Sequence, residues 1–132
     1  MKTKNAGLQR KMRLYAPLHI RKKFMKVALS KELRKQLKRR SMGVRSGDQV
    51  QIIKGKFKGT SGIVTSVDLK KMRVYVDTAV VKKRNGTQAQ VALVTPKLRI
   101  IKLVTTDKKR QSIMETKSAV ENVAKDKTGV AK

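Results

Sequence analysis

The chain has 132 residues and a formal net charge of +27, from 35 Lys and Arg against 8 Asp and Glu. A folded chain with this imbalance repels itself unless a polyanion neutralises it, and nucleic acid binds basic proteins by releasing condensed counterions. Cysteine is absent, which excludes disulfides and cysteine-ligated zinc. No segment is long and apolar enough for a membrane span, and we expect no secretory signal. We therefore expect a nucleic-acid-binding protein without a cofactor, a metal, a small-molecule substrate or a membrane partner.

The charge divides the chain into three parts. Residues 1–45 hold 16 basic side chains and one acid, residues 46–106 hold 12 and three, and residues 107–132 hold seven and four. Only 39% of the residues are hydrophobic, so the core must be small. We interpret the parts as a basic N-terminal arm with helices, a β domain, and a C-terminal helix with a flexible tail.

The first part predicts an extended arm followed by two helices. Residues 2–13 have no hydrophobic period, which favours an extended arm. A helix is predicted from near Pro17 to about residue 26, since proline is tolerated in the first turn of a helix. A second helix is predicted after Ser30, an N-cap residue type, and it ends at the basic run 38–40. Its narrow apolar stripe consists of Leu29, Leu33 and Leu37.

The middle part changes to a strand pattern. Five short β-branched runs begin at Val50, Ile63, Val74, Val91 and Leu98. Turn residues separate them, and Asn85-Gly86 is typical of a hairpin because both residues tolerate positive φ. The pattern predicts a mainly β fold, as a small barrel or sandwich of about five strands.

The third part predicts one short helix. Asp107 is an N-cap candidate for residues 108–117, with Ile113 and Met114 facing inward. From Ser118 onward the chain is polar, and we expect it to be loose in isolation.

A loop rich in glycine and lysine lies between the first two β-branched runs. Gly55, Gly59 and Gly62 alternate there with Lys54, Lys56 and Lys58. Glycine allows sharp turns and close approach by a phosphate backbone, and the lysines supply neutralising charge. The alternative interpretation is a tight turn with ordinary exposed lysines. Phe57 in this loop either stacks on an RNA base or packs on the β domain.

Residues 45–64 resemble the KOW motif, a strand–loop–strand unit of several ribosomal proteins and transcription elongation factors. The matching residues are Gly47, Asp48, Val50, Ile52, Gly55, Lys58, Gly59, Gly62 and Val64. The resemblance implies an SH3-like barrel and a nucleic-acid or ribosomal context.

The flanking segments are similar to large-subunit ribosomal protein twenty-four in its archaeal and eukaryotic form, numbered twenty-six in eukaryotes. The similarity covers about residues 10–117, through segments 15–21, 29–34, 40–42, 83–87 and 107–115, and departs from the family at Gly43, where we expect proline. It implies a structural constituent of the large subunit in the cytoplasmic ribosome. It also implies direct binding to the large-subunit ribosomal RNA near its 5′ region, an early role in assembly, and neighbouring ribosomal proteins near the polypeptide exit tunnel.

The candidate RNA contacts are mostly arginines, which pair bidentately with phosphate, and lysines, which act as point charges. His19 is the only histidine and has no metal-ligating partner, so we interpret it as a hydrogen-bonding residue of a basic helix. Tyr75 is a weaker candidate. The predicted RNA-binding residues are Arg10, Arg13, Tyr15, His19, Arg21, Lys22, Lys23, Arg34, Arg39, Arg40, Arg45, Lys54, Lys56, Phe57, Lys58, Lys82, Lys83, Arg84 and Asn85. The structural glycines are Gly47, Gly55, Gly59 and Gly62.

Two other binding functions and an enzymatic function fit the sequence less well. A KOW transcription factor usually carries an α/β domain before its barrel, and residues 1–45 are too short and too basic for one. A DNA-compacting protein rarely has basic extensions of this size. We expect no enzyme, because the sequence holds no nucleophile–base pair, no metal-ligand cluster and no Walker-type phosphate loop.

Overall fold

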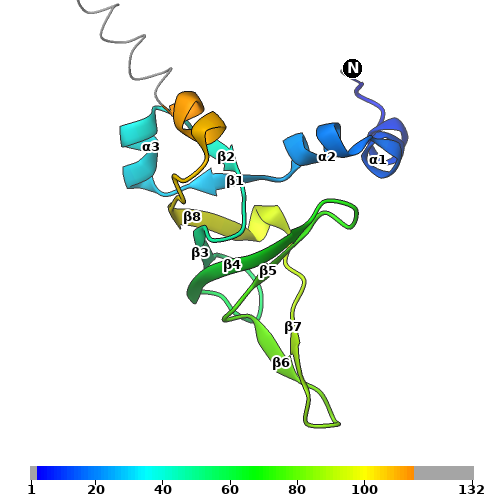
Figure 1. Cartoon of the computed structure of the whole chain (residues 1–132). Helices are drawn as coiled ribbons and strands as arrows, with labels where there is room; N and C mark the ends of the chain where they lie inside the picture. The colour runs from blue at the N-terminus through cyan, green and yellow to red at the C-terminus, as the bar shows by residue number, and fades with distance from the viewer. Residues whose placement is uncertain (1–2, 115–132) are drawn as a thin grey trace, which may run out of the picture.

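The computed structural model describes residues 3–114 (Figure 1). Two helices, α1 (Ala6–Tyr15) and α2 (Leu18–Phe24), come first. The remaining elements are β1 (Lys26–Leu29), α3 (Lys31–Leu37), β2 (Ser41–Gly43), β3 (Gln49–Ile52), β4 (Ser61–Asp68), β5 (Arg73–Val76), β6 (Val80–Lys82), β7 (Gln88–Gln90), η1 (Thr95–Lys97) and β8 (Leu98–Lys102). Residues 108–114 are helical.

The predicted extended arm is wrong, because α1 occupies most of it. Asn5 caps this helix, and its Oδ1 accepts hydrogen bonds from the N–H groups of Gly7 at 2.9 Å and Leu8 at 3.5 Å. No residue of α1 is buried. The helix therefore depends on its cap and on residues of good helix propensity rather than on an apolar face. A helix without a buried face has no hydrophobic period, so the absence of a period did not exclude a helix here.

Helices α2 and α3 begin where the sequence predicts. α2 begins directly after Pro17. Ser30 caps α3, and its Oγ accepts a hydrogen bond from the Leu33 N–H at 3.2 Å. α3 ends at Leu37, and its C-cap residue, Lys38, has φ +50°.

Strands β1 and β2 were not predicted. α2 ends at Phe24, and the chain continues into β1, which pairs antiparallel with β2 and parallel with β8. Leu29, predicted as part of a helical stripe, is a fully buried residue of β1, whereas Leu33 and Leu37 on α3 pack against the core. These two strands are defined by pairing with distant segments, which a local pattern does not contain.

The sheets confirm a mainly β fold with helices. Six strands are ordered β2-β1-β8-β3-β4-β5, and β6 and β7 form a separate two-stranded sheet. The run predicted at 91–93 supplies an isolated bridge between Val74 and Leu93 rather than a full strand. Within residues 3–114, no strand pairing joins β5 back to β2, so closure into an SH3-like barrel stays a prediction.

The core is aliphatic and lies on one face of the large sheet. Along β3, buried and half-buried residues alternate. Val50 of β3 and Ile100 of β8 are paired partners, and both are fully buried. Phe57 is half-buried against this core, which favours packing over base stacking for its side chain.

The C-terminal helix begins as predicted. Asp107 Oδ1 accepts a hydrogen bond from the Lys109 N–H at 2.9 Å. Met114 packs against the core, but the inward placement of Ile113 is wrong, since 45% of its surface is exposed. The predicted continuation to residue 117 and the loose segment from Ser118 lie outside the described residues.

Candidate nucleic-acid interface

A buried ion pair joins the β domain to the C-terminal helix. Asp48, just before β3, is 0% exposed, and Arg110 is 3% exposed. Arg110 Nη1 donates to Asp48 Oδ1 at 2.7 Å, and Nη2 donates to Oδ2 at 2.8 Å. The same carboxylate accepts the backbone N–H of Arg45 at 2.9 Å and of Val104 at 3.0 Å. This bidentate geometry gives strong, directional charge-assisted hydrogen bonds.

Arg110 also reaches the end of β2. It donates to the backbone carbonyls of Gly43 and Val104, each at 3.2 Å. The pair therefore holds together the end of β2, the start of β3, the segment after β8 and the C-terminal helix. Sequence reasoning did not single out Arg110, because its partner lies 62 positions away.

A groove of about 790 Å³ lies beside this ion pair, between α2, β4 and the C-terminal helix. We call it the α2–β4 groove. Among residues 3–114, no Asp or Glu lines it. The basic side chains that line it, apart from Arg110, are His19, Lys22, Lys23, Lys26, Arg45 and Lys109.

The groove brings four predicted RNA-binding residues together from two distant segments: His19, Lys22, Lys23 and Arg45. Lys26 and Lys109 were missed as candidates. Lys26 belongs to the basic run 21–26 and Lys109 to the basic run 108–110, and only the fold places these two runs at one groove. Arg45 forms an ion pair with Asp107, and their side chains are 39% and 29% exposed. Solvent-exposed pairs of this kind are weak, so a phosphate can displace the carboxylate.

The glycine–lysine loop is a compact turn with an exposed basic rim. Its backbone closes through hydrogen bonds from the Gly59 N–H to the Ile52 carbonyl at 2.8 Å and from the Lys58 N–H to the Gly55 carbonyl at 3.1 Å. Gly55 and Gly59 have φ of +110° and +91°, which glycine adopts without strain. Lys54, Lys56 and Lys58 are exposed.

The two remaining predicted glycines are constrained by packing as well. Gly47 has φ +87°, and a Cβ there would lie 3.0 Å from Val104 Cγ2. Gly62 is buried, and a Cβ there would lie 2.8 Å from Val76 Cγ1. The fold therefore requires these glycines whether or not RNA is bound.

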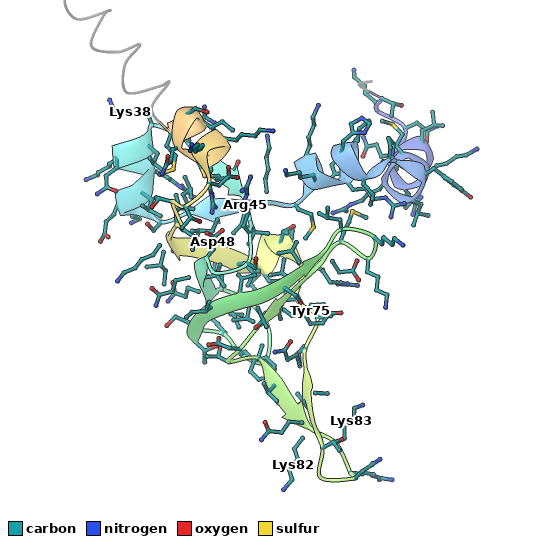
Figure 2. All side chains as sticks on the ribbon, viewed as in Figure 1. Lys38, Arg45, Asp48, Tyr75, Lys82 and Lys83 are labelled. Atoms are coloured by element: carbon teal, nitrogen blue, oxygen red, sulfur yellow. The ribbon has the colours of Figure 1, made fainter. Side chains whose placement is uncertain are left out.

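The predicted Asn85-Gly86 hairpin is confirmed as the turn between β6 and β7. The Lys83 N–H donates to the Thr87 carbonyl at 2.9 Å, and Gly86 has φ +79°. Figure 2 shows Lys82 and Lys83 on this projecting hairpin, at the opposite end of the molecule from Arg45 and Asp48. Lys82, Lys83, Arg84 and Asn85 are all exposed, so the hairpin is a second basic surface separate from the groove.

The arginines of the N-terminal part differ in their surroundings. Arg10 and Arg13 on α1 are exposed, as is Tyr15. Arg21, in contrast, donates to the Ala16 carbonyl and the Lys70 carbonyl, each at 2.8 Å, and also to the Leu14 carbonyl. Its guanidinium therefore fixes the turn between α1 and α2 against the turn after β4.

The arginines on and after α3 lie outside the groove lining. Arg34 and Arg39 are half-buried, and Arg40 is exposed. The buried Nε atoms of Arg34 and Arg39 have no hydrogen-bond partner in the part of the chain that the structure describes. A contact of these residues with RNA stays a prediction.

The basic side chains of the groove, the loop and the hairpin suit polyanion binding. Within residues 3–114, no group of three His, Cys, Asp or Glu side chains is placed to hold a metal ion. Among the described helices, none combines the length and the apolar character needed to cross a membrane.

Comparison with known protein families identifies the chain. Residues 3–117 match the model of the ribosomal protein L26 family. This family unites the eukaryotic L26 proteins with their archaeal counterparts, which are numbered twenty-four. This range contains α1, α2, the whole β domain, the hairpin and the Asp48–Arg110 pair. The chain therefore belongs to this family of ribosomal proteins, which are structural constituents of the large subunit of the cytoplasmic ribosome.

Proposed function

We propose that this protein binds large-subunit ribosomal RNA directly, near the 5′ region of that RNA. It acts early in assembly of the subunit, and it lies near the outer mouth of the exit tunnel beside other ribosomal proteins. The observation that supports RNA binding most strongly is the α2–β4 groove, whose charged lining residues in the described part of the chain are all basic. The family supports the ribosomal setting.

Phosphate contacts supply most of the binding free energy in this mechanism. Lys and Arg side chains displace condensed counterions from RNA, so the affinity falls steeply as salt rises. The groove, the glycine–lysine loop and the β6–β7 hairpin each present basic side chains to solvent. Phe57 packs on the core and Tyr75 is half-buried, so neither ring is placed for base stacking, whereas Tyr15 is 77% exposed.

Affinity for a 5′ fragment of the large-subunit RNA, measured over a series of salt concentrations, tests this function. We expect a steep negative slope of log affinity against log salt. Replacing Lys54, Lys56 and Lys58 by glutamine lowers the slope by about one for each lost phosphate contact. The control replaces three exposed lysines outside both the loop and the groove, Lys31, Lys35 and Lys102, and so removes the same charge. An affinity that does not change with salt refutes the mechanism.

A parallel measurement with duplex DNA at matched salt addresses the alternatives. Preference for the duplex points to a DNA-compacting protein, and preference for the RNA fragment supports the proposal. The KOW transcription-factor interpretation and an enzymatic role have no support in the family, whose members are ribosomal proteins.

The early role in assembly and the position near the tunnel need tests of their own. Pulse-labelled precursors of the large subunit are expected to contain the protein before most other proteins join. Crosslinks from the exposed hairpin lysines to tunnel-exit neighbours test the location. Late joining, or crosslinks only to distant proteins, refutes the respective proposal.

A further inference from the structure

A β-bulge turns two consecutive hydroxyl side chains toward the α2–β4 groove. β4 pairs with β5 through Val64↔Val76 and Ser66↔Tyr75, and the register shifts between Val64 and Ser66. In a regular strand, neighbouring side chains point to opposite faces. Here Thr65 and Ser66 are both exposed, and both line the groove. Bulges often redirect side chains in this way beside functional sites.

A third hydroxyl joins them from a different element. Ser46, in the turn before β3, is exposed and lines the same groove. In the part of the chain that the structure describes, no hydrogen bond from the protein engages the side-chain oxygen of Ser46, Thr65 or Ser66. The groove therefore combines these three hydroxyls with the lysines of α2 and β1 and with Arg45 and Lys109.

The rest of the lining is apolar but not aromatic. Met25, Met42, Val44, Val67 and Leu69 also line the groove. Base stacking in RNA-binding modules requires aromatic faces or arginine planes. Of the described lining residues, His19 offers an aromatic ring and Arg45 a guanidinium plane, and Arg45 is paired with Asp107. The hydroxyl, lysine and aliphatic side chains that make up most of the lining suit the sugar and phosphate groups of a nucleic acid better than its bases.

We propose that the α2–β4 groove binds the sugar–phosphate backbone of an RNA strand, and that Ser46, Thr65 and Ser66 select RNA over DNA by hydrogen bonding to ribose 2′-hydroxyl groups. This inference rests on the proposed function and assigns a site to it. The 2′-hydroxyl both donates and accepts hydrogen bonds and distinguishes RNA from DNA. Serine and threonine hydroxyls also both donate and accept, so each can pair with a 2′-hydroxyl in either direction.

The phosphates would contact the basic side chains of the groove. Lys22 comes from α2 and Lys26 from the start of β1, while Lys109 comes from the C-terminal helix. The Asp48–Arg110 pair positions Lys109, because it fixes the C-terminal helix against the β domain. Both chemical parts of the proposed ligand therefore have partners in one groove.

The test uses the full chain with two single-stranded oligonucleotides of identical sequence, one RNA and one DNA, at matched salt. In the variant Thr65→Val/Ser66→Ala, valine keeps a β-branched side chain at position 65 and alanine is close in size to serine. Both positions are exposed, so folding is retained. We expect its RNA affinity to fall about fivefold for each hydrogen bond lost, the factor for a bond of about 1 kcal/mol. Its DNA affinity is expected to stay unchanged.

The control Ser61→Ala/Thr106→Val also removes one serine and one threonine hydroxyl, but at exposed positions outside the groove lining. It is expected to bind RNA and DNA as the wild type does. If the ratio of RNA to DNA affinity in Thr65→Val/Ser66→Ala equals that of the wild type or of the control, the role of the hydroxyls is refuted.

A second measurement tests whether the groove contacts the phosphates of the RNA backbone. Lys22→Gln/Lys26→Gln/Lys109→Gln is expected to lower the salt slope by about 0.7 for each phosphate contact to a single strand. Lys31→Gln/Lys35→Gln/Lys102→Gln loses the same charge and is expected to change the slope less. Equal losses would overturn the groove as the site. Failure of the proposed function would appear separately, as a wild-type protein that does not prefer the 5′ ribosomal RNA fragment over duplex DNA.

Discussion

Substitution of Arg110 by methionine tests how strongly the buried ion pair stabilises the fold. The two side chains are 3% and 0% exposed. Removing the guanidinium leaves the Asp48 carboxylate buried with two backbone N–H donors, those of Arg45 and Val104. Breaking a buried ion pair by removing one partner costs about 3–5 kcal/mol. Because two donors remain, we expect a loss of about 3 kcal/mol in the free energy of unfolding, the lower end of that range.

The converse substitution, Asp48→Ala, is expected to cost more, about 5 kcal/mol. It leaves a buried guanidinium with only two carbonyl acceptors, at 3.2 Å each. It also leaves the N–H groups of Arg45 and Val104 without their acceptor. Small domains have unfolding free energies of about 5–15 kcal/mol, so either loss is a large fraction of the total.

Urea denaturation followed by circular dichroism measures both losses, provided that the slope against denaturant is unchanged. The double variant Asp48→Ala/Arg110→Met is expected to lose less than the sum of the single losses, since the residues are in direct contact. Arg45→Gln is the control, because it breaks the more exposed pair with Asp107 and is expected to cost about 0–1 kcal/mol. An Arg110→Met protein as stable as the Arg45→Gln protein refutes the reasoning, and so do strictly additive single losses.

Two further substitutions are expected to lower the urea midpoint by smaller amounts. Gly62→Ala introduces a Cβ that lies 2.8 Å from Val76 Cγ1 and also contacts Asp77, whose carboxylate accepts a hydrogen bond from the Ile63 N–H. Overpacking of this kind costs about 1–3 kcal/mol in the free energy of unfolding. An unchanged urea midpoint would contradict this prediction. Ser30→Ala removes the N-cap of α3 and is expected to lower the free energy of unfolding by about 1 kcal/mol. Ser30→Asp is expected to retain most of the stability, because aspartate also caps helices. Equal midpoints for the two variants would contradict the capping role.

Elements with strong local patterns were predictable from the sequence. β3, β4, β5 and β8 follow β-branched runs, and the β6–β7 turn follows Asn85-Gly86. The caps of α3 and of the C-terminal helix follow Ser30 and Asp107. α1 was mispredicted because its helix has no buried face, and hydrophobic period is informative only where a face is buried.

The candidate site was predictable in part. His19, Lys22, Lys23 and Arg45 were all predicted as RNA contacts, and the fold places the four at one groove. The interpretation of Arg21 as an RNA contact did not anticipate that three backbone carbonyls occupy its guanidinium. An arginine in a basic run looks the same in sequence whether its donors face solvent or a turn.

The sequence by itself indicated a polyanionic partner, because 8 Asp and Glu leave 27 of the 35 Lys and Arg charges unbalanced. It also indicated the glycine turns, since glycine adopts the positive φ observed at Gly55 and Gly59 without strain. Only the tertiary structure decided which charges act together. Asp48 and Arg110 meet across 62 positions, and Thr65 and Ser66 at the bulge in β4 line the same groove as Lys109. Such contacts depend on strand pairing between distant segments, and a local residue pattern does not specify them.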